Sequence, residues 1–139
     1  MMQRTMTPSL KNKTITSPAS VLIVAKSDPT RDSLRILLET KPWINIVAQT
    51  DDKAKVPGLI KQHQPTLVIL DTNVCPDSLD WLILLAQIQA AAPQTRCLVL
   101  TDTIHKQQLA RESRAHGSLI KGYSAEKLFE AITELTLTR

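Results

Sequence analysis

Glycine is scarce in this chain, and its scarcity argues against one class of ligand site. Only Gly58, Gly117 and Gly122 occur among the 139 residues. Nucleotide phosphates are commonly cradled by the backbone N–H groups of a glycine-rich loop, and three scattered glycines cannot form one. A flavin- or nucleotide-binding module therefore stays only as a rival interpretation of the chain.

Cysteine and histidine are also few, and their spacing does not predict a metal site. Cys75 and Cys97 are too far apart for a metal knuckle, and Cys97 lies in an apolar run where a thiol behaves as a small hydrophobe. We expect both to be reduced. No HxxxH spacing relates the three histidines, which predicts solvent-facing helix residues rather than ligands. These are His63, His105 and His116.

Long apolar runs are missing as well. No stretch approaches the roughly 18 uncharged apolar residues that a membrane span requires. Residues 1–19 also lack the apolar core of a secretory signal peptide. We therefore expect a cytoplasmic protein that has no membrane partner.

The net charge of +4 is concentrated at the N-terminus. Residues 1–19 contain Arg4, Lys11 and Lys13 and no acidic residue, whereas the rest of the chain holds 14 basic and 13 acidic residues. The folded part therefore lacks the basic excess that direct nucleic-acid binding requires. The Ser, Thr and Pro content of residues 1–19 predicts a disordered basic tail, followed by one folded domain over 20–139.

Short apolar runs alternate with helical patterns from residue 20 onward. The runs are rich in Val, Ile and Leu, as is typical of strands covered on both faces. Predicted strands are 21–25, 44–48, 66–70, 97–101 and 118–120. Five helices are predicted. The first follows Ser27-Asp28-Pro29, the next three span 52–63, 79–91 and 104–115, and the last runs from Ser124 through Leu135. This alternation predicts an α/β fold, a three-layer doubly wound (βα)5 sandwich whose five-stranded parallel sheet has the flavodoxin-like order 2-1-3-4-5.

Polar side chains stand where four of the strands are predicted to end. They are Lys26, Asp71, Thr101 and Lys121. The carboxyl ends of parallel strands meet at one edge of a sheet, so these groups are expected to share a pocket. A carboxylate, a hydroxyl and ammonium groups together suit phosphoryl chemistry, because a phosphorylated carboxylate needs donors fixed nearby.

The chain resembles the receiver domain of bacterial two-component response regulators over residues 20–137. The resemblance rests on VLIVAKSDPTRDSLRILLE, PTLVILDTNV, CLVLTD and HGSLIKGYSAEKLFEAI. It implies that Asp71 is the phospho-acceptor, Thr101 the switch hydroxyl and Lys121 the phosphate-binding lysine. Ser118 stands where the family usually has the aromatic residue that follows the switch hydroxyl.

The predicted pocket departs from the family at its metal site. Receivers follow the first strand with two acidic residues that hold Mg²⁺, and here these positions are Ala25 and Lys26. The remaining candidate ligands, Asp71, Asp28 and Asn73, make a poor set for an ion that prefers several oxygen ligands. Asp28 is also explained as a helix cap before Pro29. We therefore expect no cofactor and impaired Mg²⁺ binding.

Two interpretations of Lys26 stay open at this point. Its ammonium group could occupy the place of the metal and pair with Asp71, or it could point to solvent in a site that has decayed. The segment TNVCPDSLDW after Asp71 is about two residues longer than is usual and puts Trp81 near a position that is usually glycine. Such a change could alter the docking of a phosphodonor, although surface loops tolerate insertions well.

The resemblance implies a stand-alone receiver that works in a phosphorelay by protein–protein contact. The alternative is a pseudo-receiver that binds partners without phosphorylation. Expected partners are a histidine kinase or phosphotransfer protein and an effector bound through the face at 104–135, and a homodimer also stays open. Beyond self-phosphorylation and autodephosphorylation we expect no enzyme activity, and contact with DNA only through a partner.

Overall fold

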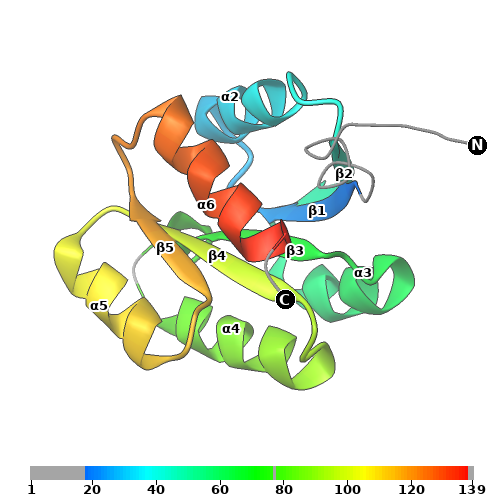
Figure 1. Ribbon diagram of the computed structural model, residues 1–139. Coiled ribbons are helices and arrows are strands. Elements are labelled where there is room, and N and C mark those ends of the chain that lie inside the picture. Colours follow the sequence, from blue (N-terminus) through cyan, green and yellow to red (C-terminus); the bar gives the residue numbers. More distant parts are fainter. Residues whose placement is uncertain (1–17, 77, 138–139) are drawn as a thin grey trace, which may run out of the picture.

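The protein, described by a computed structural model over residues 18–76 and 78–137, is built of alternating strands and helices (Figure 1). The strands are β1 (Ala19–Val24), β2 (Ile44–Thr50), β3 (Leu67–Asp71), β4 (Arg96–Thr101) and β5 (Gly117–Ile120). The α-helices are α2 (Pro29–Leu38), α3 (Val56–His63), α4 (Asp80–Ala91), α5 (Ile104–Glu112) and α6 (Ala125–Leu137). Two short 3₁₀-helices, η1 (Lys53–Lys55) and η2 (Thr72–Val74), complete the described elements.

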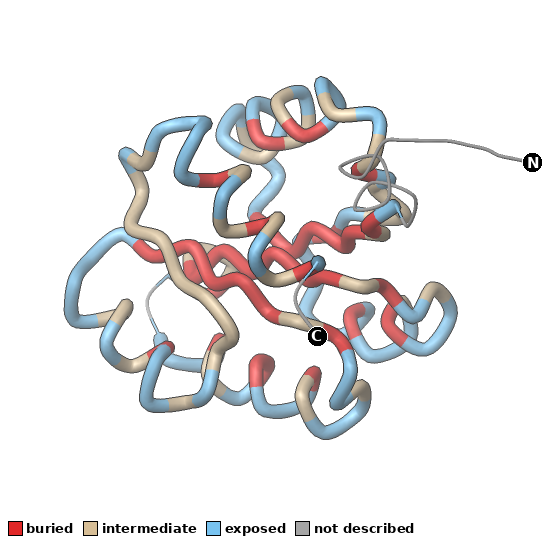
Figure 2. The backbone as a smooth tube through the Cα atoms, in the orientation of Figure 1, coloured by how far each residue is buried: buried red, intermediate tan, exposed pale blue. Residues whose placement is uncertain are grey.

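The strands form one parallel sheet in the order β2-β1-β3-β4-β5, which confirms the predicted fold class. Every residue of the central strand β3 is buried, as its sequence LVILD predicts for a strand covered on both faces. Figure 2 shows this buried sheet running through the middle of the molecule, with exposed residues on the outer sides of the helices.

Two apolar clusters fill the space on either side of the sheet. On one face α2 and α6 pack with Leu34, Leu38, Leu128 and Ile132 against β1, β3 and β4. On the other face α3, α4 and α5 cover the sheet (Figure 1). Trp81, in the first turn of α4, is fully buried in this second cluster. Trp81, which was expected near a position that is usually glycine, is therefore a core residue here.

Local chemistry explains where the predicted helices differ from the observed ones. The helix expected over 52–63 is divided into η1 and α3, because Pro57 lacks an N–H group and fits only the first turn of an α-helix. The helix expected over 104–115 ends at Glu112. Arg114 follows with a φ of 66°, a left-handed conformation that ends helices.

His116 is the clearest error of the sequence prediction, because it is not on a helix. It is half-buried just before β5, where its Nδ1 atom accepts the backbone N–H of Cys97 at 3.0 Å. The backbone N–H of His116 donates to the Cys97 carbonyl at 3.0 Å. Burial and the positive charge of Arg96 lower the pKa of His116 below 6.5. Burial also raises the pKa of the neighbouring Cys97 thiol to about 12, so that thiol stays protonated.

The structure describes little of the segment predicted to be a disordered tail. β1 begins at Ala19, within the predicted tail, and residues 1–17 lie outside the described residues. None of the helices described is both long enough and apolar enough to cross a membrane.

Replacing Ile69 by Ala should destabilise the fold strongly. The Ile69 side chain is fully buried in the centre of β3, so truncation removes buried methyl groups and leaves a cavity. The expected loss in the free energy of unfolding is about 2–5 kcal/mol in urea denaturation. Ile36→Ala on α2, where the residue is 57% exposed, is the control and should change it by less than about 0.5 kcal/mol.

The lowered pKa of His116 predicts a pH-dependent contribution to stability. The unfolded chain binds this proton more readily than the folded protein, so stability is fully present above pH 6.5 and falls as the pH drops toward the folded-state pKa. His116→Asn keeps an acceptor for the Cys97 N–H group but cannot titrate. Urea midpoints measured between pH 7.5 and 5 should fall less steeply for this variant, and identical slopes would contradict the assignment.

Candidate functional site

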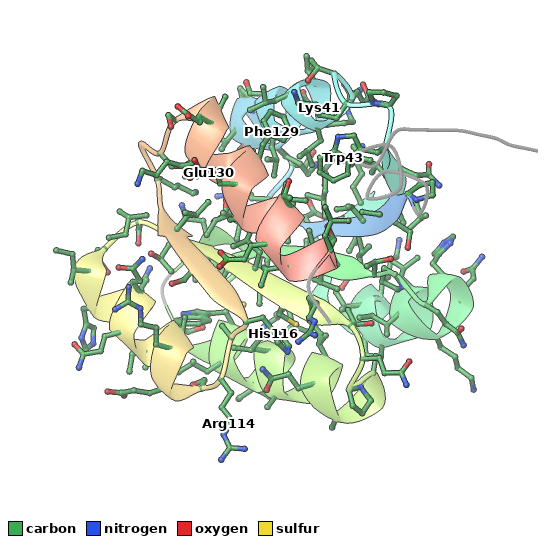
Figure 3. The ribbon with its side chains drawn as sticks, viewed as in Figure 1. Lys41, Trp43, Arg114, His116, Phe129 and Glu130 are labelled. Atoms are coloured by element: carbon green, nitrogen blue, oxygen red, sulfur yellow. The ribbon has the colours of Figure 1, made fainter. Side chains whose placement is uncertain are left out.

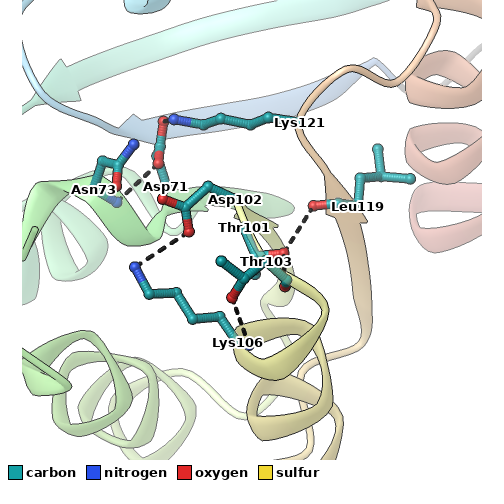
Figure 4. A network of polar contacts seen from close by, with 8 residues as sticks. All are labelled: Asp71, Asn73, Thr101, Asp102, Thr103, Lys106, Leu119 and Lys121. Carbon is teal, nitrogen blue, oxygen red and sulfur yellow. Dashed lines mark hydrogen bonds and ion pairs between the residues drawn. The ribbon is translucent and has the colours of Figure 1, made fainter.

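Three of the four residues expected to share a pocket come together at the carboxyl ends of neighbouring strands, whereas the fourth, Lys26, is exposed. Asp71 ends β3, Thr101 ends β4, and Lys121 directly follows β5. The backbone N–H of Lys121 donates to the Thr101 carbonyl at 2.7 Å, which fixes the turn after β5 against β4. Figure 4 shows Asp71 and Lys121 pointing toward each other across this edge of the sheet.

A short ion pair joins Asp71 and Lys121. The distance from Lys121 Nζ to Asp71 Oδ2 is 2.8 Å, and the side chains are 26% and 6% exposed, respectively. The other carboxylate oxygen, Oδ1, accepts the backbone N–H of Asn73 at 2.9 Å. A buried carboxylate is costly unless it is paired and hydrogen-bonded, and both requirements are met here.

The Thr101 hydroxyl is buried but bonds away from the carboxylate. It donates toward the carbonyl oxygens of Thr103 at 3.3 Å and Leu119 at 3.5 Å (Figure 4). These contacts connect the end of β4 to the beginning of α5 and to β5. The structure therefore brings Asp71 and Lys121 into direct contact, and it places Thr101 beside them without a hydrogen bond to Asp71.

The positions of the missing acidic pair carry no replacement carboxylate. Ala25 is buried, and Lys26 is exposed and belongs to none of the ion pairs found among the described residues. Lys26 therefore does not pair with Asp71 in the place of a metal, and its side chain lies at the surface. The cation that Asp71 contacts is Lys121 instead.

Arg31 is a residue of this edge that the sequence reasoning missed. Its Nη1 atom donates to the Ala25 carbonyl at 3.3 Å, and Nη2 donates to the Ser27 hydroxyl at 3.1 Å. Its Nε atom is buried without a partner in the described part of the chain. Its four-residue spacing from Ser27 did not predict the contact, because Ser27 precedes α2 and lies outside the helical repeat.

Tyr123 is a second residue that the sequence did not point to, and the charge of Asp71 acts on its phenol. Burial and the negative charge of Asp71 raise the pKa of the Tyr123 phenol above its usual value. The tyrosine follows Gly122, whose φ of 102° lets the chain turn sharply after Lys121. It packs against the same apolar cluster as α6.

The oxygen donors at this edge do not fit the magnesium ion that the resemblance implies. Asp28 uses its carboxylate to cap α2, accepting the N–H groups of Thr30 at 2.9 Å and Arg31 at 3.2 Å. Asp71 is engaged by Lys121, and Ala25 and Lys26 offer no side-chain oxygen. No group of three or more acidic, His or Cys residues arranged to hold a metal occurs in residues 18–76 and 78–137. Hard divalent cations favour several oxygen ligands, which these side chains do not supply.

The connection from η2 to α4 is held at its α4 end by polar contacts. Lys53 Nζ lies 3.3 Å from Asp80 Oδ2, a half-exposed ion pair that joins η1 to the start of α4. The N–H of Asp80 also bonds to the Ser78 hydroxyl at 3.2 Å. Because Trp81 is buried directly after Asp80, the loop enters α4 at a fixed point.

Comparison with known proteins gives one consistent family. The family model described as "Response regulator receiver domain" matches residues 21–133. The Fimbriae Z protein of Salmonella typhimurium is 28% identical over 117 residues, which cover 83% of this chain but only 55% of that protein. This chain thus matches little more than half of that relative's length.

Solved structures show the same fold at low sequence identity. A two-component response regulator of the LuxR family from Aurantimonas sp. SI85-9A1 has a TM-score of 0.78 at 22% identity, with 88% of each chain covered. The isolated REC domain of RcsB from Salmonella enterica serovar Typhimurium, in the presence of phosphomimetic BeF3⁻, has a TM-score of 0.77 at 19% identity. The match covers 88% of this chain and 91% of that domain.

Replacing Lys121 by Met should expose the dependence of Asp71 on its cation. The variant leaves a buried carboxylate without its cation, so the free energy of unfolding at pH 7 should fall by about 1–3 kcal/mol. Asp71→Asn should cost less, because the Lys121 ammonium can still reach water. In urea denaturation the double variant should lose less than the sum of the two single losses. Additive losses would mean that the pair is not coupled.

Proposed function

Because the chain belongs to the response regulator receiver domain family, we propose that it is a signalling module whose phosphoryl group is carried by Asp71. The observation that supports this most directly is the contact of 2.8 Å between Lys121 Nζ and the Asp71 carboxylate at the end of the central strand. A nucleophilic oxygen and a fixed positive charge are the two parts that phosphoryl transfer needs from a protein.

In the proposed reaction an Asp71 carboxylate oxygen attacks the phosphorus atom of a donor. A new oxygen–phosphorus bond forms an acyl phosphate, and the bond between phosphorus and the donor's leaving group breaks with its electron pair going to that group. The Lys121 ammonium is close enough to exchange its ion pair with the carboxylate for one with a phosphoryl oxygen. The backbone N–H of Asn73 stays as a donor to the acyl group.

The response to phosphorylation is proposed to pass through Thr101 to α5. For its hydroxyl to reach a phosphoryl oxygen, it must give up its bonds to the Thr103 and Leu119 carbonyls, which are long at 3.3 and 3.5 Å and so cost little to break. Thr103 is the N-cap of α5. The usual aromatic follower is replaced by Ser118, whose carbonyl accepts the Gln107 amide of α5 at 3.5 Å. We propose that this contact between the Gln107 side chain and the Ser118 carbonyl carries the change instead.

Metal assistance is proposed to be impaired in this reaction. With Ala25 and Lys26 in place of acidic residues, the positive charge near Asp71 comes from Lys121. The same features favour the second candidate function, a pseudo-receiver that binds partners without phosphorylation. In that case the Asp71–Lys121 pair is a structural contact that holds the β3 and β5 ends together.

The proposed partners are proteins. A histidine kinase or phosphotransfer protein would supply the phosphoryl group, and an effector would bind residues 104–135, which include α5, β5 and most of α6. Ile104, the first residue of α5, is 74% exposed and offers an apolar contact on that face. The same face could also serve a homodimer. Self-phosphorylation and autodephosphorylation are the only reactions proposed.

Incubation with acetyl phosphate should test the chemical half of the proposal. We expect intact mass spectrometry to show one added phosphoryl group, and peptide mapping to place it on Asp71. Because the donors present do not fit the ion, excess EDTA in place of Mg²⁺ should slow the reaction by no more than about tenfold. Asp71→Asn is the matched control and should gain no mass.

Each other outcome has a distinct meaning. A reaction that stops in EDTA would contradict the impaired metal dependence, while leaving Asp71 as the acceptor. No added mass in a folded protein would remove the phosphorylation proposal and leave the pseudo-receiver. Partner binding that is equal for the wild type and Asp71→Asn would support the same conclusion.

A further inference from the structure

The outer side of α6 carries a ridge of three glutamates, whose neighbouring cations Lys41, Arg96 and Lys127 form no ion pair with them. Glu126, Glu130 and Glu134 are exposed and follow one another at intervals of one helical turn. Like charges at this spacing destabilise a helix. The ion pairs found among the described residues include none of the three. The ridge therefore leaves an excess of negative charge on this side of α6, which a positively charged segment would neutralise.

A shallow groove runs beside this ridge toward the loop between α2 and β2. It is lined by Lys41, Phe129 and Thr133 together with the three glutamates. Lys41 Nζ lies 4.8 Å from the centre of the Phe129 ring, so its charge is directed at the ring rather than at a carboxylate. Figure 3 shows Lys41, Trp43 and Phe129 gathered where this loop meets α6. The groove thus combines an apolar floor with net negative charge.

The chain enters the described fold directly beside this groove. The backbone N–H of Ala19 donates to the Trp43 carbonyl at 2.8 Å, and Trp43 is two residues from Lys41. Trp43 and Phe129 pack against the same apolar cluster. Residues 1–17 are therefore joined to the fold at the end of the groove, next to the residues that line it.

Residues 1–17 have the charge and the spacing to match the ridge. They contain Arg4, Lys11 and Lys13 and no acidic residue. In an extended segment Lys11 and Lys13 would project on the same side, about 6.6 Å apart. Glu130 and Glu134 are separated by about 6 Å along the helix. Six residue-to-residue steps separate Lys13 from Ala19, enough to span about 20 Å.

We propose that the N-terminal segment, residues 1–17, docks along the groove of α6 with Lys11 and Lys13 facing Glu130 and Glu134. Individual exposed ion pairs are weak, but a segment of the same chain is held at an effective concentration on the order of millimolar, so weak contacts suffice. This proposal does not depend on phosphorylation of Asp71.

The docked segment would cover part of the face proposed for partners. Glu126, Glu130 and Glu134 lie within residues 104–135, so an effector using α6 would have to displace the segment. A basic partner would compete with it directly, whereas a partner that contacts only α5 would not. The segment would thus act as a built-in competitor whose strength falls with ionic strength.

Zero-length carbodiimide crosslinking of the full chain would test the docking. The reagent joins lysine ammonium and carboxylate groups that are in contact, and peptide mass spectrometry identifies the pairs. In the monomer fraction we expect amide links from Lys11 or Lys13 to Glu130 or Glu134, and their loss in 0.5 M salt. Glu130→Gln with Glu134→Gln should abolish them. Glu112→Gln on α5 is the matched control and should leave them unchanged.

Amide NMR of a charge swap gives a second readout. Lys11→Glu with Lys13→Glu should shift the Phe129 and Thr133 signals, and adding Glu130→Lys with Glu134→Lys should shift them back. Crosslinks found only in covalent dimers would overturn the proposal in favour of a second copy on the groove. Absence of these crosslinks, or no change in the α6 signals in the first variant, would also overturn it.

Discussion

The contact between Asp71 and Lys121 is the constraint on which the functional edge of this molecule depends. Asp71 ends a strand whose every residue is buried, so its carboxylate loses most of its contact with water when the sheet forms. Such a group must be matched by a cation and by backbone donors, or the strand end would be unstable. The order of the sheet brings the needed lysine from β5, two strands away, across the end of β4. The stability of the edge and its chemistry therefore rest on the same pair.

The fold and the main site residues could be predicted from sequence because both follow from backbone rules. Strands covered on both faces need continuous apolar runs, and parallel strands deliver their last residues to one edge. These rules placed Asp71 and Lys121 at the same edge, but they also put Lys26 there, whose side chain is exposed. The direction of the Thr101 hydroxyl could not be predicted, because it depends on carbonyl oxygens that only the folded α5 and β5 present. The same applies to His116, whose acceptor role arises from its place beside Cys97 in the sheet.

The replaced acidic pair changes the charge of the edge and, with it, which cation serves Asp71. Ala25 contributes no oxygen ligand, and Arg31 is anchored by the Ala25 carbonyl and the Ser27 hydroxyl rather than by a carboxylate. Lys26 points to solvent, so it does not compete with Lys121. The edge therefore holds a carboxylate and a lysine, and it lacks the acidic residues that would recruit a divalent ion. A positive charge that is covalently part of the chain is always present, whereas a bound ion depends on its concentration.

The short connection between Lys121 and α6 links this edge to the α6 groove that was proposed to hold the N-terminal segment. Only Gly122, Tyr123 and Ser124 separate the lysine from the helix, and the Ser124 hydroxyl accepts the N–H of Lys127 at 3.1 Å to cap its first turn. Tyr123 is packed against the cluster beneath α6 and feels the charge of Asp71. A shift of Lys121 toward a phosphoryl group would therefore pull on the end of α6 that carries Glu126. Coupling between two sites is reciprocal, so if a shift of Lys121 changes the docking proposed for residues 1–17, that docking changes the Asp71–Lys121 contact by the same free energy.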